Sequence, residues 1–217
     1  MGKRETKRRE MAKLVARFTG VQVRRQLRRR RRIGRMVMKL LRRCLRHLWL
    51  DADDALRAVG EAGIGRLEAR VRASEQEHSG QICLCVEASL PPSYLWRHVA
   101  RGESIEDVVR DRALTLFGKQ RVWDTEHNNG VLVYLLLAEH RIEIVADRAL
   151  ARCTNEAHWH ELVERVAEAC RAGHIEQGLS TAVDAVGAAL LAHFPRTHAE
   201  GTIPRTDPGL PDRPTIR

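Results

Sequence analysis

Two apolar runs in the middle of the chain decide its fold: Gly130-Val-Leu-Val-Tyr-Leu-Leu-Leu-Ala138 and, after Glu139-His140, Arg141-Ile-Glu-Ile-Val-Ala146. Strand-forming residues dominate both runs and only a short step separates them, which predicts an antiparallel hairpin. The first run is apolar throughout, as expected of a central strand covered on both faces. The second alternates in polarity, so we expect it to lie nearer a sheet edge.

One further strand and several helices surround this hairpin. Residues 81–88 form a third apolar run, and Pro91-Pro92 after it predicts a loop. Apolar side chains recur at helical spacing in four segments, which are residues 51–78, 105–118, 159–170 and 175–190. The order predicts an α/β fold, a three-layer α/β/α sandwich with a small mixed sheet containing a central hairpin, plus a basic N-terminal helix.

Charge divides the chain into parts with different expected partners. Residues 1–50 hold 19 Lys and Arg against 2 Asp and Glu, a balance of +17, whereas residues 51–217 have a balance of −7. We therefore expect four parts: a basic, disordered arm (1–35), an amphipathic helix (36–50), the α/β domain (51–195) and an extended, loosely held tail with several prolines (196–217). The alternative for the arm is a start codon placed too far upstream, with the native chain beginning at Met36 or Met38.

The predicted helix over residues 36–50 has one apolar and one basic side. Leu41, Cys44, Leu45 and Leu48 follow the helical period, and Lys39, Arg42, Arg43 and Arg46 lie opposite them. Such a helix can lie on an anionic membrane surface with Trp49 at the interface. The alternative is a helix docked on the domain with its charges solvated, and the residues do not choose between the two.

The remaining composition narrows the cellular setting. No apolar run is long enough to span a membrane, and charges interrupt the only segment that resembles a signal peptide. Five cysteines without a C-x-x-C pair argue against a disulfide framework and a zinc knuckle. We expect a cytoplasmic protein, or one peripheral to the inner membrane. The arginines of residues 1–35 suit nucleic acid, but no aromatic residue interrupts the run Arg28 to Arg32 to stack on bases, so that partner is less favoured.

The hairpin region resembles the signature of the TPM-domain family, in its short bacterial form. The resemblance rests on residues 122–137 and 142–148, on His78-Ser-Gly-Gln-Ile before the first strand, and on His193-Phe-Pro. It covers about residues 54–195. The resemblance implies an α/β/α sandwich, and it implies the acid-phosphatase activity and divalent-cation binding that have been proposed for some members.

An oxygen-rich loop precedes the hairpin and gives the main candidate site. Asp124, Glu126, Asn128 and Asn129 lie within six residues, and the hairpin should bring Asp147 beside the two asparagines. Hard cations such as Ca²⁺ or Mg²⁺ prefer such oxygen ligands. We expect Asp124, Glu126 and Asp147 to converge on one cation, with Arg148 as an anion clamp for a phosphate.

Ordinary structural roles are open alternatives for these residues. Asn129-Gly130 is a common turn signal, and Asp124 can cap a turn. Asp147 can pair with Arg148 or cap the following segment. No residue is assigned as a nucleophile or general base, and no other cofactor is expected.

The sequence therefore predicts an interaction and quality-control module with an unidentified protein partner and weak cation-assisted phosphatase activity. The alternative is an adaptor that binds a membrane or nucleic acid through its basic N-terminus.

Overall fold

The computed structural model describes residues 34, 37–154, 156–196 and 210–217. The chain divides into two compact units, Met1–Leu45 and Arg46–Arg217. Residues 37–49 are helical, so the predicted amphipathic helix is present and the boundary between the units falls within it. Apart from residue 34, the arm predicted over residues 1–35 lies outside the described residues.

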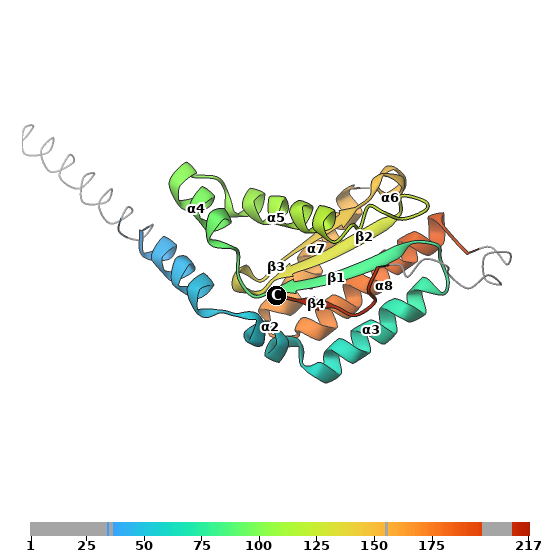
Figure 1. Cartoon of the computed structure of the whole chain (residues 1–217), viewed down its shortest axis with the longest axis horizontal. Helices are drawn as coiled ribbons and strands as arrows, with labels where there is room; N and C mark the ends of the chain where they lie inside the picture. The colour runs from blue at the N-terminus through green and yellow to red at the C-terminus, as the bar shows by residue number, and fades with distance from the viewer. Residues whose placement is uncertain (1–33, 35–36, 155, 197–209) are drawn as a thin grey trace, which may run out of the picture. The chain divides into compact units, whose positions relative to one another are not determined.

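The second unit contains the predicted alternation of helices and strands (Figure 1). Its helices are α2 (Ala52–Val59), α3 (Glu61–Glu75), α4 (Pro92–Arg101), α5 (Ile105–Lys119), α6 (Arg148–Cys153), α7 (Glu156–Arg171) and α8 (Ile175–His193). Its strands are β1 (Gln81–Glu87), β2 (Gly130–Leu136), β3 (Arg141–Ala146) and β4 (Thr215–Ile216). A short 3₁₀ helix, η1 (Leu137–Glu139), connects β2 to β3.

The strands form one mixed sheet in the order β3-β2-β1-β4. β2 and β3 pair antiparallel from Val131 opposite Ala146 to Leu136 opposite Arg141, which confirms the predicted hairpin. β1 runs parallel to β2, with Gln81 opposite Gly130. Every residue of β1 and β2 is buried, whereas β3 at the edge is only partly buried.

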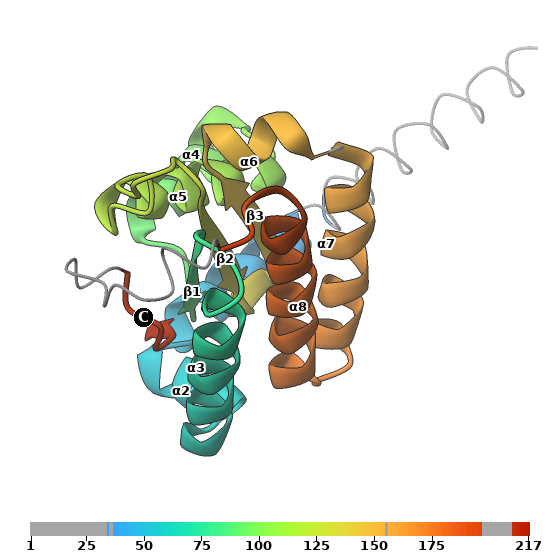
Figure 2. The ribbon, with the colours of Figure 1, turned by 90° about the vertical axis from the view of Figure 1, so that its right-hand side faces the viewer.

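Helices cover both faces of this sheet, which confirms the three-layer α/β/α sandwich (Figure 2). On one face α5 packs on β2 and β3 through a core that includes Cys83, Leu132 and Leu116. On the other face α3, α7 and α8 bury a larger core that includes Leu84 and Val133. Alternate residues of β1 and β2 point into the two cores, because successive strand side chains face opposite ways.

Two expectations about helices are wrong. The helix predicted over residues 51–78 is two helices, because Gly60 adopts a φ of +76° that ends α2 and starts α3 in a new direction. The predicted loop after Pro91 is helix α4, with Pro92 in its first turn. Proline suits that position because its missing N–H would have no partner there and its φ is already helical.

The end of the chain is held on the sheet, which also differs from the expectation of a loose tail. Residues 197–209 lie outside the described residues, but Thr215 and Ile216 pair parallel to Cys85 and Val86 of β1. The N–H of Ala88 donates to the carbonyl of Arg217 at 2.8 Å. Short extended segments of this kind carry little periodicity, so the sequence alone does not reveal them.

Gly130 at the start of β2 admits a close approach of the preceding loop. A Cβ added at this position would lie 1.9 Å from the carbonyl oxygen of Val122. That oxygen belongs to backbone and cannot rotate away. Glycine is therefore required here to let residues 121–129 fold over the beginning of the hairpin.

Gly130→Ala should therefore lower the free energy of unfolding by about 3 kcal/mol, the upper part of the range for overpacking a core. Urea denaturation followed by circular dichroism measures this change. Gly118→Ala is the matched control, because nothing lies within 4 Å of a Cβ added there and Gly118 is within α5. The control should be neutral or stabilising, since alanine is the better helix former. Equal losses for the two variants would contradict this account.

Candidate functional site

The hairpin brings most of the predicted site residues to one end of the sheet. The N–H of Asp147 donates to the carbonyl of Gly130 at 2.9 Å, and the N–H of Ala149 donates to the carbonyl of Asn128 at 3.1 Å. Asp147 thus lies beside the strand that directly follows Asn128 and Asn129, as predicted from the register. The predicted site therefore lies where β2 starts and β3 ends.

Asn129 is fully buried and fixed by its neighbours. Its backbone N–H donates to Oγ1 of Thr125 at 3.0 Å, and its Nδ2 donates to Oγ of Ser79 at 3.1 Å. Asn128 before it adopts a left-handed φ of +51°, which asparagine tolerates better than most residues. The loop therefore turns sharply and directs Asn129 into the interior.

Asp147 caps helix α6, which agrees with one of the alternatives for this residue. Its Oδ1 accepts from the N–H of Arg148 at 2.7 Å, and its side chain is only 6% exposed. The Arg148 guanidinium is exposed, and it donates to Oδ1 of Asn128 at 3.2 Å. Arg148 thus lies at the surface directly above a buried carboxylate and a turn amide.

Two buried oxygens at this end have no hydrogen-bond partner. Within the described residues, three buried side-chain polar atoms lack one: Gln120 Nε2, Asn129 Oδ1 and Asp147 Oδ2. Burying a polar atom without a partner costs about 1–3 kcal/mol. Two of the three are oxygens at the predicted site, so this end of the sheet contains acceptors without donors.

Three predicted ligands remain: Asn128 accepts from Arg148 through Oδ1, and Asp124 and Glu126 lie at the surface. Asp124 pairs with Arg121 at 2.5 Å across one turn and remains half exposed, and Glu126 is exposed. The part of the chain that the structure describes has no group of three or more His, Cys, Asp and Glu side chains that could hold a metal ion. The expected convergence of Asp124, Glu126 and Asp147 is therefore not observed.

The chemistry of the remaining pair fits a hydrated cation better than a fully caged one. A carboxylate oxygen and an amide oxygen are hard ligands, and both lack a donor. Ca²⁺ takes about six to eight protein and water oxygens, whereas Mg²⁺ keeps several waters and uses one or two carboxylates. Of the two cations expected from the sequence, Mg²⁺ makes the smaller demand on Asn129 and Asp147.

A buried ionic cluster lies at the opposite end of the sheet. Arg112 of α5 makes a bidentate pair with Glu87 at the end of β1, with distances of 2.9 and 2.5 Å, and the Tyr134 hydroxyl donates to the same carboxylate at 2.7 Å. Burial and the neighbouring Glu87 raise the pKa of Tyr134, and the bond to Glu87 raises the pKa of Arg112. The hydroxyl is therefore neutral and the guanidinium charged at ordinary pH.

The members of this cluster come from three separate elements, so no local sequence pattern reveals it. Glu87 at the end of an apolar strand was its only local sign. Arg112 also lies over the ring of Tyr94, at 5.4 Å from the centroid. The cluster joins α5 to β1 and β2, and every charged atom in it has a partner, so its role is structural.

Arg112→Met should lower the free energy of unfolding by about 3–5 kcal/mol, because it leaves the Glu87 carboxylate buried without a cation. The double variant Arg112→Met with Glu87→Gln should recover part of that loss. Chemical denaturation of the single and double variants measures both. Arg97→Met is the control, since Arg97 pairs with Asp111 and Glu103 at the surface, and it should cost clearly less. A loss as large as that of Arg112→Met would refute the assignment.

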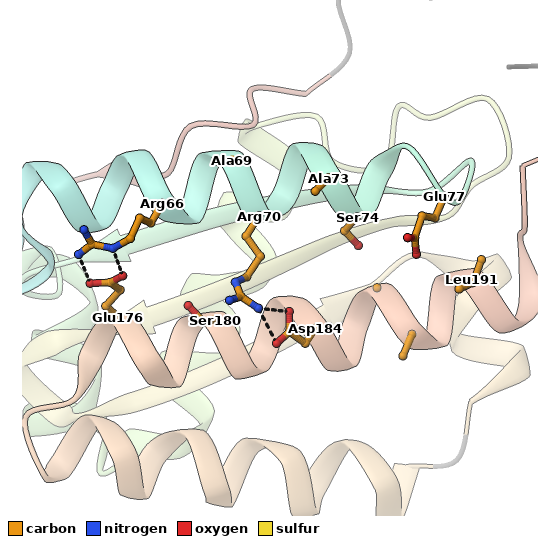
Figure 3. A pocket seen from close by; sticks show the side chains of 12 residues that line it. Arg66, Ala69, Arg70, Ala73, Ser74, Glu77, Glu176, Ser180, Asp184 and Leu191 are labelled. Carbon is orange, nitrogen blue, oxygen red and sulfur yellow. Dashed lines mark hydrogen bonds and ion pairs between the residues drawn. The ribbon is translucent and has the colours of Figure 1, made fainter. Parts of the chain in front are cut away.

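A groove of about 690 Å³ runs between α3 and α8 and contains none of the predicted site residues (Figure 3). Two ion pairs cross it, a bidentate one from Arg66 to Glu176 and one from Nη1 of Arg70 to both oxygens of Asp184, so these charges neutralise one another. The bond from Arg66 lowers the pKa of Glu176. The charges of these four side chains are paired with one another. None of the four therefore offers an unpaired charge to a ligand in the groove.

Burial keeps three thiols in the protonated form. It raises the pKa of both Cys83 and Cys85 to about 12, and that of Cys170 to about 11. The thiolate, not the thiol, is the nucleophile and metal ligand. Cys83 and Cys85 pack as small apolar residues of the core.

These observations first define a class: an α/β/α sandwich with a mixed sheet, an antiparallel hairpin and an acceptor-rich end beside helix α6. The chain belongs to the TPM domain family, whose match covers residues 51–189. Helix 37–49 lies outside that match. Among solved structures, the chain is similar to the NMR structure of the BA42 protein from the psychrophilic bacterium Bizionia argentinensis.

The likeness to BA42 concerns the fold. The two chains are 20% identical with a TM-score of 0.57, and the comparison covers 72% of this chain and 93% of that chain. No curated protein matches the sequence. These comparisons show the family and the fold of the chain.

Proposed function

We propose that this TPM domain protein is an interaction module that helix 37–49 brings to an anionic membrane surface, where the domain meets a protein partner. The observation that carries the proposal is an apolar sector of this helix that remains exposed. No helix in the described part of the chain is long and apolar enough to cross a bilayer, so the contact would be peripheral. A place at the inner membrane agrees with this proposal.

The exposed apolar side chains fall on one side of the helix. At about 100° per residue they span an arc of about 120°. The members, each between 45% and 82% exposed, are Val37, Met38, Leu41, Leu45, Leu48 and Trp49. Cys44, assigned to this stripe from the sequence, lies outside the arc and is only half exposed. An exposed apolar stripe of this width is typical of a surface that binds a partner or a membrane.

Basic side chains flank the apolar sector on one side. Lys39, Arg42 and Arg46 occupy an arc of about 60° next to it, and all three are exposed. Each basic side chain near an anionic bilayer contributes about 1 kcal/mol, and this contribution falls with salt. The apolar face of such a helix can contact the acyl chains, and the basic face beside it can contact the anionic headgroups.

The end of the helix is bound to the domain. Arg46 donates to the carbonyl of Ala138 at 2.7 Å, and the buried ring of His47 accepts from the N–H of Leu90 at Nδ1, 3.0 Å away. Because Nδ1 is an acceptor, Nε2 carries the proton, and it faces Oε1 of Glu139 at 3.1 Å. Binding of the apolar sector to a bilayer would therefore also attach the domain to the bilayer.

A nucleic-acid role would instead depend on residues 1–35, of which only residue 34 is among the described residues.

The full chain should sediment with vesicles of phosphatidylcholine and phosphatidylserine, and this binding should fade as salt is added. The double variant Leu41→Asp with Leu45→Asp should weaken binding more than tenfold, because each buried leucine contributes about 1.5–3 kcal/mol. Co-sedimentation measures the bound fraction. Leu114→Asp is the control, because Leu114 of α5 is 46% exposed and lies outside the helix. Undiminished binding of the double variant would assign the contact to another part of the chain and remove the proposal.

A second function, weak cation-assisted hydrolysis of phosphate esters, is supported by the two unpaired oxygens of Asn129 and Asp147. These oxygens would hold Mg²⁺, and the exposed Arg148 would bind a phosphate oxygen. When bound, the cation would polarise the phosphoryl group. In the reaction water adds to phosphorus, the bond from phosphorus to the alcohol oxygen breaks, and a proton from water passes to the departing alcohol.

Asp147→Asn tests this second function without removing the helix cap, since asparagine caps helices as well as aspartate does. The wild-type chain should gain thermal stability on addition of Mg²⁺ and hydrolyse p-nitrophenyl phosphate only with the metal. The variant should lose both properties and keep its stability without metal. Asp124→Asn should retain both, because Asp124 is paired at the surface. Equal Mg²⁺ stabilisation of wild type and Asp147→Asn would exclude the site.

A further inference from the structure

Helix α4 presents its apolar side to water. None of its ten residues is buried. Trp96 is 67% exposed and Val99 41% exposed, and Pro92 and Ala100 beside them are exposed as well. These four residues lie within an arc of about 100°. A helix on the surface of a soluble domain normally turns its apolar residues inward, as α4 does with Tyr94 and Leu95. Trp96 and Val99 form a second apolar group that faces outward.

The other side of α4 holds it to the domain, with Tyr94 and Leu95 partly buried against the core. The Tyr94 hydroxyl shares a 2.7 Å hydrogen bond with Thr115 of α5, and Arg97 bonds to Asp111 at 2.6 Å. Nδ1 of His98 bonds to the carbonyl of Glu103 at 2.7 Å. Polar contacts therefore fix which side of α4 faces outward, so the exposure of Trp96 is not the result of a loosely attached helix.

This apolar side lies at the same end of the sheet as the last residues of helix 37–49. Leu90, two residues before α4, donates to His47, and Leu48 and Trp49 follow His47 directly. Leu48 is 74% exposed and Trp49 82% exposed. In Figure 1, α4 follows the carboxyl end of β1. Two exposed tryptophans thus belong to elements that one hydrogen bond connects.

We propose that the apolar side of α4, with Trp96 at its centre, is a second contact of the domain with the anionic bilayer. The inference deepens the proposed function and rests on it. Tryptophan favours the boundary between water and lipid, where its ring is apolar and its N–H stays wet. Arg101 at the end of α4 lies 3.9 Å from Glu103, and its side chain, 70% exposed, places a cation at the surface beside the apolar side. Within the second unit, Trp49 and Trp96 would then give the domain two separate contacts with the membrane.

Fluorescence of single-tryptophan chains tests this contact. The chain has four tryptophans, Trp49, Trp96, Trp123 and Trp159, and three would be replaced by phenylalanine in each variant, with circular dichroism confirming the fold. The vesicles contain brominated phosphatidylcholine and phosphatidylserine. Emission of the chains that keep Trp49 or Trp96 should be quenched. The chain that keeps Trp123 is the control, because Trp123 is 47% exposed but lies near the opposite end of the sheet, and its emission should not change.

Vesicle binding of the four-tryptophan chain gives an independent measure. Trp96→Ser should weaken the partition into the same vesicles about tenfold, as the loss of one buried aromatic side chain predicts. Trp123→Ser should leave it unchanged. The variants differ at one exposed position each, so a folding defect is not expected from either.

Each outcome decides between the two proposals. Quenching of Trp49 without Trp96 would overturn this inference and leave the membrane proposal in place. Absence of quenching at both would overturn both. If Trp96 is shielded from iodide in the absence of vesicles and the chain elutes as a dimer, a second copy covers α4 and the inference fails.

Discussion

The pairing of β2 with a strand on each side is the constraint on which the rest of the domain depends. β1 runs parallel to it and β3 antiparallel, with Gly130 opposite Gln81 and hydrogen-bonded to Asp147. This register fixes what gathers at each end of the sheet. Asn129 and Asp147 meet where β2 begins, whereas Glu87, Glu139 and His47 lie where β1 and β2 end. At the end where β2 begins, the carbonyl of Val122 packs closely against Gly130 and fixes the preceding loop.

Sequence reasoning succeeded where periodicity and chain order determine the structure. The two apolar runs around Glu139-His140 predict the hairpin, and the hairpin in turn places Asp147 near Asn128 and Asn129. Spacing along the chain does not reveal the cluster of Glu87 with Arg112, because it needs α5 to lie across β1. For Asp124 the competing contact is local: it pairs with Arg121, three residues earlier in the same loop, and this pair keeps its carboxylate at the surface.

The two ends of the sheet have opposite physical character. One end holds buried oxygen acceptors next to an exposed arginine, which suits a cation and a phosphate. The other end bears His47, the last turn of helix 37–49 and α4, and exposes apolar surface on both helices. The sheet separates these two properties, so a surface bound at one end would leave the other accessible. The membrane role that we propose would leave the acceptor-rich end free.

The short strand β4 has a consequence for the order of folding. It pairs with β1, although nearly the whole domain lies between them in the chain. Contacts of such long range form slowly, because a large loop must close before they contribute. During synthesis the outer edge of β1 therefore stays unpaired until the last described residues emerge. An unpaired edge invites strand addition from other chains. The nascent domain should consequently be most prone to aggregation and to chaperone capture just before its completion.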